Sequence, residues 1–115
     1  KAFDKHHVQE RKKWLGAYNP NSVIENTERE VSFADFIDRE LIHFSSYDNI
    51  RSIPSVCDGF KPSQRKVLYG SYLRGLDKTE LKVAQLAGFV SDKAQYHHGE
   101  ESLQGTIVGM AQNFV

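Results

Sequence analysis

Residues 58–69 read DGFKPSQRKVLY, and this stretch decides the expected fold. The Asp-Gly pair at its start is typical of a turn. Pro62 follows at a place where the first turn of a helix accepts a proline, and Gly75 provides a helix stop signal. The stretch therefore predicts a helix that begins at Pro62 and ends before Gly75. Its expected buried stripe consists of Val67, Leu68, Tyr72 and Leu73.

Two further helices are predicted on the C-terminal side of this one. The first runs from about Thr79 to Val90, and its apolar residues are Leu81, Ala84, Leu86 and Val90. The second begins near Glu100. Its apolar residues recur at the spacing of a core-facing helix: Leu103, Ile107, Met110 and Phe114. Strand signals are weak, so the expected fold class is mainly α, either with helix–turn–helix packing or as a generic bundle.

The N-terminal side is predicted to hold a linker and one more helix. Residues 16–31 are rich in turn-forming residues and are expected to be the linker, after a short helix or domain tail at 1–15. Ser32 and Asp35 resemble a capping box. The apolar residues behind this cap recur at helical spacing: Phe33, Phe36, Ile37, Leu41 and Phe44. Residues 45–60 are predicted to form a loop.

The composition is that of an ordinary globular domain. The chain has 115 residues, of which 39% are hydrophobic and 26% charged, and it has no apolar run long enough to span a membrane. Its single cysteine, Cys57, excludes an internal disulfide framework and a cysteine-based zinc site, and is typical of a reducing compartment. The chain has no initial Met and no stop signal after its last apolar stretch, so we expect a fragment of a larger protein.

The formal net charge of zero combines two segments of opposite sign. Residues 25–48 carry seven acidic and two basic residues, a net charge of −5. Residues 51–82 carry seven basic and three acidic residues, a net charge of +4. Because a polyanion responds to the local field, a nucleic-acid partner is compatible with this composition.

Two groups of residues are candidates for phosphate contacts. Lys61, Arg65 and Lys66 open the predicted helix after a glycine turn, where free backbone N–H groups favour an anion. Residues 96–100, YHHGE, place two imidazoles before a helix start. The alternatives are a solvated helix face for the first group and a surface loop for the second. No Gly-rich phosphate loop, His-Glu-x-x-His helix or nucleophile elbow is present in the sequence.

Several strings, taken in order, resemble the DNA-gate domain of eukaryotic-type topoisomerase II, a type IIA DNA topoisomerase. They are residues 49–54 (NIRSIP), 58–69, 82–88 (KVAQLAG), 96–100 and 111–115 (AQNFV). Residues 82–88 resemble the recognition helix of that domain. Residues 33–37 and 40–42 fit the segment leading into the gate, and residues 5–15 resemble the end of the preceding Toprim region. The resemblance covers nearly the whole chain.

The resemblance implies an enzyme that cuts both strands of one duplex, passes a second duplex through and reseals the break. It implies ATP hydrolysis in a distant domain, a tyrosine that attacks each scissile phosphate, and Mg²⁺ held by acidic Toprim residues. The fold of this region in the family is a winged helix, also called CAP-like. The implied partners are double-stranded DNA and a second copy in a homodimer, with no membrane. The expected location is the nucleus, or the host cytoplasm for a viral protein.

By motif position, the resemblance also implies roles for individual residues. Arg51 contacts a backbone phosphate near the cleavage site, and His98 supports the transition-state charge at the scissile phosphate, so both are catalytic in supporting roles. The set implied to bind DNA is Arg51, Lys61, Arg65, Lys66, Lys82, Gln85, Tyr96, His97 and His98. Most of these contacts are to phosphate, so little sequence specificity is expected.

The sequence departs from the family at the nucleophile. The family's tyrosine directly follows an arginine, and none of the five tyrosines here does so. The acidic Mg²⁺ ligands and the ATPase motifs are also missing, so we expect no Mg²⁺ or ATP to be bound by residues of this chain, and the isolated fragment to be inactive.

The expected domains are the end of the Toprim region at 1–15, a linker at 16–31, and the helical part of the winged-helix domain, truncated before the wing, at 32–115. Two other functions remain open from the residues alone. One is a free-standing winged-helix module that binds DNA without chemistry. The other is a helical interaction domain whose basic patch meets an acidic protein.

Overall fold

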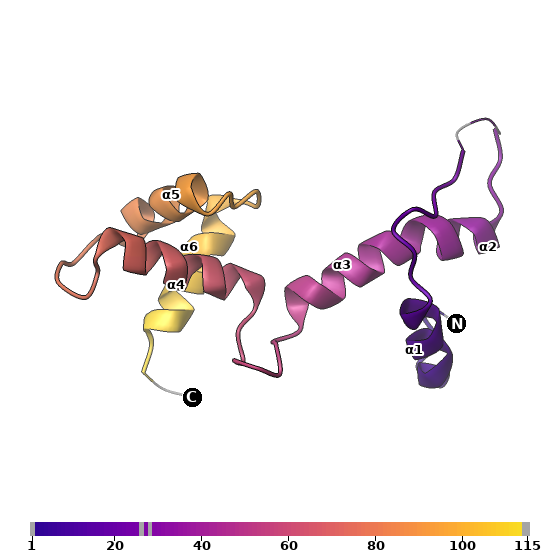
Figure 1. Ribbon diagram of the computed structural model, residues 1–115, viewed down its shortest axis with the longest axis horizontal. Helices are drawn as coiled ribbons and strands as arrows, with labels where there is room; N and C mark the ends of the chain where they lie inside the picture. The colour runs from indigo at the N-terminus through magenta and orange to yellow at the C-terminus, as the bar shows by residue number, and fades with distance from the viewer. Residues whose placement is uncertain (1, 26, 28, 114–115) are drawn as a thin grey trace. The chain divides into compact units, whose positions relative to one another are not determined.

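The computed structural model describes residues 2–25, 27 and 29–113, and the chain divides into two compact units. Unit 1 is Lys1–Ser52 and unit 2 is Ile53–Val115. Within the described ranges every regular element is a helix (Figure 1), which confirms the mainly α fold class. None of these helices is both long and apolar enough to cross a membrane.

Unit 1 contains α1 (Val8–Gly16), α2 (Phe33–Asp35), the π-helix η1 (Phe36–Leu41) and α3 (Ile42–Ser52). The last three follow one another without a break, and they begin at the predicted cap. The Ser32 hydroxyl oxygen accepts the backbone N–H of Asp35 at 3.0 Å and donates to the Asp35 carboxylate at 2.6 Å. This pairing satisfies a backbone donor that the first helical turn leaves free.

Helices α1 and α3 contact each other, and each buries one residue: Trp14 is 8% exposed and Ile42 is 4% exposed. The ring of His43 in α3 forms hydrogen bonds with the segment that follows α1. Its Nε2 donates to the Ser22 carbonyl at 2.7 Å, since a carbonyl can only accept. The Nδ1 atom of the same ring forms a hydrogen bond with the Tyr18 hydroxyl at 3.1 Å.

The predicted loop at residues 45–60 is wrong in its first half, because α3 continues to Ser52. Serine and asparagine have only weakly unfavourable helix propensities, and the apolar residues Phe44, Tyr47 and Ile50 keep a helical spacing through this segment. The helix ends where Pro54 restricts the residue before it to extended backbone.

Unit 2 contains α4 (Pro62–Arg74), α5 (Val83–Lys93) and α6 (Glu100–Ala111). Each of these helices contacts the other two, and they form one small group in Figure 1. Their shared core consists of Val67, Leu86, Ala87, Val90, Leu103 and Ile107. Leu103 and Val90 lie at its centre, each with a relative exposure of 0%.

The predicted bounds of α4 are confirmed, but its predicted stripe is only partly buried. Gly75 takes a left-handed φ of +70° and ends the helix, and Val67 is 4% exposed. Tyr72 and Leu73, by contrast, are 75% and 53% exposed. The second contact point of α4 with the core is Gly70, where an added Cβ would lie 2.6 Å from Val90 Cγ2. A residue without a side chain leaves no mark in an apolar pattern, so the predicted stripe includes Val67 correctly, misses Gly70 and wrongly includes Tyr72 and Leu73.

The other two helices of unit 2 lie close to their predicted positions. Helix α5 begins four residues later than expected and ends three residues later, with Leu86 and Val90 buried as predicted. Helix α6 begins at Glu100 as predicted and buries Leu103 and Ile107. The last member of its predicted stripe, Phe114, lies outside the described residues.

Candidate nucleic-acid interface

The start of α4 is built by a tight loop at residues 55–60. The Asp58 carboxylate accepts the backbone N–H of Phe60 at 3.0 Å, and Gly59 takes a positive φ of +72° that favours glycine. Lys61 then occupies the N-cap position of α4 in an extended conformation, and its backbone N–H donates to Gln64 Oε1 at 2.8 Å. The half-buried Lys61 is thereby placed at the positive end of the helix dipole.

Arg65 makes a two-point ion pair with Asp58 across this loop. Its Nε and Nη2 atoms donate to the two carboxylate oxygens at 2.9 and 2.8 Å. The Arg65 guanidinium lowers the pKa of Asp58 to about 2, and the pairing raises the pKa of Arg65. One edge of the guanidinium is therefore occupied, whereas the hydrogens on Nη1 and the second hydrogen on Nη2 are not used in this ion pair.

Lys66, one residue further along α4, reaches a different part of unit 2. Its Nζ atom donates to the backbone carbonyl of Gln95 at 2.8 Å. Gln95 lies in the segment between α5 and α6, next to the histidine string. The structure therefore brings Lys66 together with the predicted histidine site, a link that no spacing in the sequence revealed.

The histidine string occupies the turn that leads into α6. Tyr96 packs against the core of unit 2, and its ring contacts that of His98 edge-on, with centroids 5.4 Å apart and an angle of 72°. His97 is exposed and His98 is half-buried. Gly99 is the N-cap residue of α6. The first turn of that helix carries Glu100 and Glu101, so the carboxylates favoured at a helix start are already present there.

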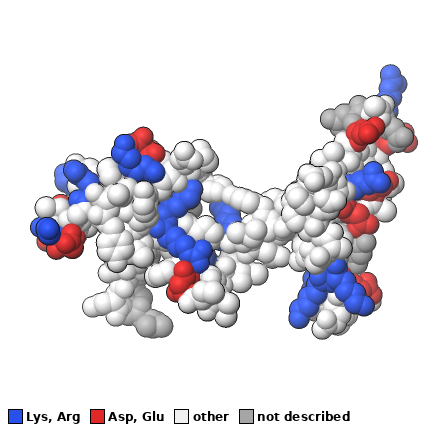
Figure 2. Space-filling view, in the orientation of Figure 1, with Lys and Arg blue, Asp and Glu red and all other residues white. Residues whose placement is uncertain are grey.

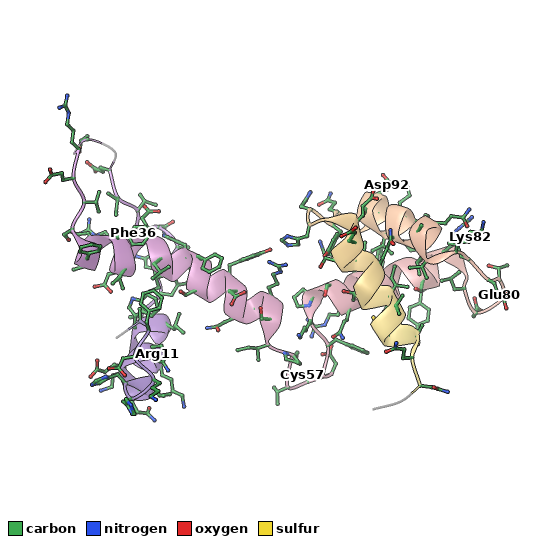
Figure 3. All side chains as sticks on the ribbon, turned by 180° about the vertical axis from the view of Figure 1, so that it is seen from behind. Arg11, Phe36, Cys57, Glu80, Lys82 and Asp92 are labelled. Atoms are coloured by element: carbon green, nitrogen blue, oxygen red, sulfur yellow. The ribbon has the colours of Figure 1, made fainter. Side chains whose placement is uncertain are left out.

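Lys82 and Gln85 lie three residues apart at the start of α5, on one side of the helix. Both are exposed, and Figure 3 shows Lys82 projecting from the end of this helix. The buried residues of α5 are Leu86, Ala87 and Val90, so the solvent side of the helix is the one that presents this pair.

Arg51 belongs to unit 1, where it is exposed in the last turn of α3. The other predicted DNA contacts all belong to unit 2. In the space-filling view of Figure 2, basic side chains gather over the part of unit 2 where α4 lies. Helix α4 carries Arg65, Lys66 and Arg74 and no acidic residue.

Two participants in this interface were missed by the sequence reasoning. Asp58 was interpreted only as part of a turn, although an acidic residue seven positions before Arg65 was a usable signal once the turn and helix start had been predicted. The Gln95 carbonyl could not be predicted from the sequence, because it is a backbone acceptor that every residue type carries. Cys57 is exposed in the loop before α4 (Figure 3) and takes no part in the contacts above.

The candidate residues for phosphate contact are cationic or imidazole side chains. No group of three or more His, Cys, Asp or Glu side chains that could hold a metal ion occurs among the described residues. The chemistry available here is the placement of guanidinium, ammonium and imidazole groups against a polyanion.

Comparison with known proteins gives matches along nearly the whole chain. The family of the DNA gyrase/topoisomerase IV A-type subunits matches residues 51–115, and the C-terminal associated domain of TOPRIM matches residues 1–49. DNA topoisomerase 2 of Saccharomyces cerevisiae is 59% identical over 99% of the chain, and that of Acanthamoeba polyphaga mimivirus is 50% identical over 99%. The chain covers only 8% and 9% of these two relatives.

A solved structure is also similar. It is the Plasmodium falciparum topoisomerase II DNA-binding, cleavage and re-ligation domain, with a TM-score of 0.71 and 50% identity. The match covers 98% of this chain and 15% of that one.

Proposed function

This chain belongs to the eukaryotic-type DNA topoisomerase II family, and we propose that it is the part of an ATP-dependent enzyme that holds the gate duplex during double-strand cleavage, strand passage and religation. The observation that carries the proposal is the match along nearly the whole chain to enzymes of this name. The basic surface of α4 supports it, because phosphate contacts dominate binding to duplex DNA.

Within this function, the proposed DNA-binding residues are those that the resemblance implied. Lys61 and Arg65 contact phosphates at the start of α4, and Lys82 and Gln85 face the groove from α5. Tyr96, His97 and His98 serve the scissile phosphate, with His98 stabilising the charge that develops there. Arg51 contacts a neighbouring phosphate, and Lys66 belongs to the same interface.

The parent enzyme is proposed to use Mg²⁺ and ATP, to act as a homodimer and to work in the nucleus, or in the host cytoplasm for a viral protein. The described residues of this chain do not suit a metal site, because they contain no cluster of metal-ligating side chains. No step through Mg²⁺ is therefore assigned to them. Their part is to bind and orient the duplex while the nucleophile comes from elsewhere in the parent.

The test is made in the full-length parent enzyme with Arg65→Ala and His98→Ala. Loss of one group that stabilises transition-state charge costs roughly a hundredfold in rate. We expect DNA cleavage and religation to slow by this order in His98→Ala, and to fall measurably in Arg65→Ala, while ATP hydrolysis without DNA stays near its original rate. His6→Ala, an exposed histidine in unit 1, is the matched control. Unchanged relaxation of supercoiled plasmid in both variants would contradict the assigned roles.

The reading frame beyond Val115 gives an independent check of the enzyme assignment. We expect an Arg-Tyr pair within a segment that forms a wing and strands, because the nucleophile of the family follows an arginine. A stop codon directly after Val115 would instead favour a DNA-binding module without chemistry.

A further inference from the structure

Lys66 differs from the other basic residues at the start of α4 in the hydrogen-bond partner of its side chain. Its ammonium donates to the Gln95 carbonyl at 2.8 Å, a bond that joins residues 29 positions apart. The neighbouring Arg65 pairs instead with Asp58 in the loop directly before α4. Lys66 is therefore the cation in α4 that is bonded to the turn carrying the histidines.

The bond is made at a place where the backbone needs support. Gln95 has a φ of +50°, in the left-handed region that residues with a side chain seldom adopt. Such a conformation persists only where its surroundings hold it. The backbone N–H of Tyr96 donates to the Ser91 carbonyl at 3.2 Å on one side of the turn, and Lys66 holds the Gln95 carbonyl on the other.

The residues directly after Gln95 are those that face the proposed chemistry. Tyr96 packs on the core and contacts the His98 ring, so the path of the backbone at Gln95 decides where both rings lie. We propose that Lys66 is a positioning residue, which holds the Tyr96–His98 segment for the scissile phosphate rather than neutralising a phosphate of its own. This inference rests on the proposed function, in which His97 and His98 meet that phosphate.

The two roles of Lys66 predict different measurements. A lysine that neutralises a phosphate contributes about 0.9 to the slope of log affinity against log salt concentration. A lysine bonded to a backbone carbonyl contributes nothing to that slope, but its loss frees the turn even without DNA. The comparison uses Lys66→Met, which removes the donor, and Lys66→Arg, which keeps one. Lys78→Met is the matched control, because this exposed lysine belongs to unit 2 outside the interface.

The first measurement is amide hydrogen exchange of residues 94–99 in the DNA-free, full-length enzyme. We expect exchange to quicken about tenfold in Lys66→Met, since a charge-assisted hydrogen bond is lost, and to stay near the original rate in Lys66→Arg and Lys78→Met. Equal exchange in Lys66→Met and the original enzyme would overturn the inference, whatever happens to DNA cleavage.

The second measurement is cleavage, together with the salt dependence of duplex binding. Lys66→Met is expected to slow cleavage at least tenfold with the same salt slope as Lys78→Met, and Lys66→Arg to restore most of the rate. Combined with His98→Ala, it should cost less than the sum of the two single losses, because part of its effect acts through His98. A salt slope less negative by about 0.9 than in Lys78→Met would overturn the inference, and so would a fully additive loss in the double variant. Normal cleavage in His98→Ala alone would instead refute the proposed function, which separates the two failures.

Discussion

At the scale of single residues, the ion pair between Asp58 and Arg65 is the most defined contact of the interface. It is a two-point pair on the surface, where ion pairs add little to folding stability. Its consequence is orientation, because the loop at residues 55–60 is closed onto α4 and the free edge of the guanidinium is aimed away from Asp58. In the proposed function, Asp58 therefore affects DNA binding through its orientation of Arg65.

The pair makes a prediction about pH. The pKa of Asp58 is lowered from 3.8 to about 2, chiefly by its hydrogen bonds with Arg65. A lowered pKa in the folded state means that the pair stabilises the fold fully above about pH 4, and that this contribution is lost as the pH falls through about 2. A titration of the Asp58 carboxyl carbon by NMR in the 115-residue chain should give a midpoint near 2.

Two variants show whether Arg65 is the cause. Arg65→Met should move the midpoint of Asp58 back toward 3.8, although the Phe60 N–H still holds it somewhat lower. Arg74→Met removes the same charge from the other end of α4 and should leave the midpoint unchanged. A wild-type midpoint near 3.8 would show that the pair does not persist in solution.

At the scale of helices, the close approach of α4 and α5 at Gly70 determines how unit 2 packs. The distance of 2.6 Å from an added Cβ to Val90 Cγ2 leaves no room for a methyl group, and Val90 lies at the centre of the core. Lys66 lies four residues before Gly70 on the same helix, and its ammonium donates to the Gln95 carbonyl after α5.

Replacing Gly70 with alanine should destabilise unit 2. Overpacking a core of this kind costs about 1–3 kcal/mol, which exceeds the gain of roughly 0.5–1 kcal/mol that alanine brings to a helix interior. Gly105→Ala in α6 is the matched control, since its added Cβ meets nothing within 4 Å and the substitution should stabilise the chain. Denaturant unfolding of both variants measures the difference, and equal stabilisation by the two would contradict the packing described here.

The helices also show what the sequence could and could not predict. Pro62 and Gly75 predicted the ends of α4 correctly, because each acts through its own backbone conformation. Leu103 and Ile107 were correctly predicted as core residues of α6, because apolar residues at helical spacing face a core. The stripe of α4 was predicted correctly at Val67 but not beyond it, because the next contact with the core is made at Gly70. Residues 45–52 are predicted as a loop because Ser, Asp and Asn favour turns. In the structure, the helix that precedes them continues through them to Ser52.

The same limit applies to the candidate site. Lys61, Arg65 and Lys66 were predicted together as one phosphate-binding group from their adjacency. The structure gives each a different environment: a helix N-cap, an ion pair with Asp58, and a bond to the Gln95 carbonyl. These differences depend on loop geometry and on backbone atoms from another helix, so no pattern of residue types reveals them.

At the scale of the whole molecule, the domain division remains a prediction. Residues 32–115 were assigned to the winged-helix domain, whereas the compact units divide after Ser52 and the two matching families meet between residues 49 and 51. Helices α2 to α3 therefore belong to unit 1 in this structure. Their predicted place in the gate concerns the parent enzyme. The chain covers only 8% of the length of the yeast relative.

The balance of 15 basic and 15 acidic residues makes a prediction for the molecule as a whole. Because this chain carries no net charge, the proposed affinity of the region for DNA depends on its local basic contacts, most of which lie in unit 2. Removing two of them, with Lys61→Gln and Lys82→Gln in one full-length protein, should make the salt slope of duplex binding less negative by about 1.8, since each phosphate contact contributes about 0.9. Lys12→Gln with Lys13→Gln removes the same charge from unit 1 and should leave the slope nearly unchanged. Equal slopes in the two double variants would mean that total charge governs binding, and the assignment of the duplex to unit 2 would then be wrong.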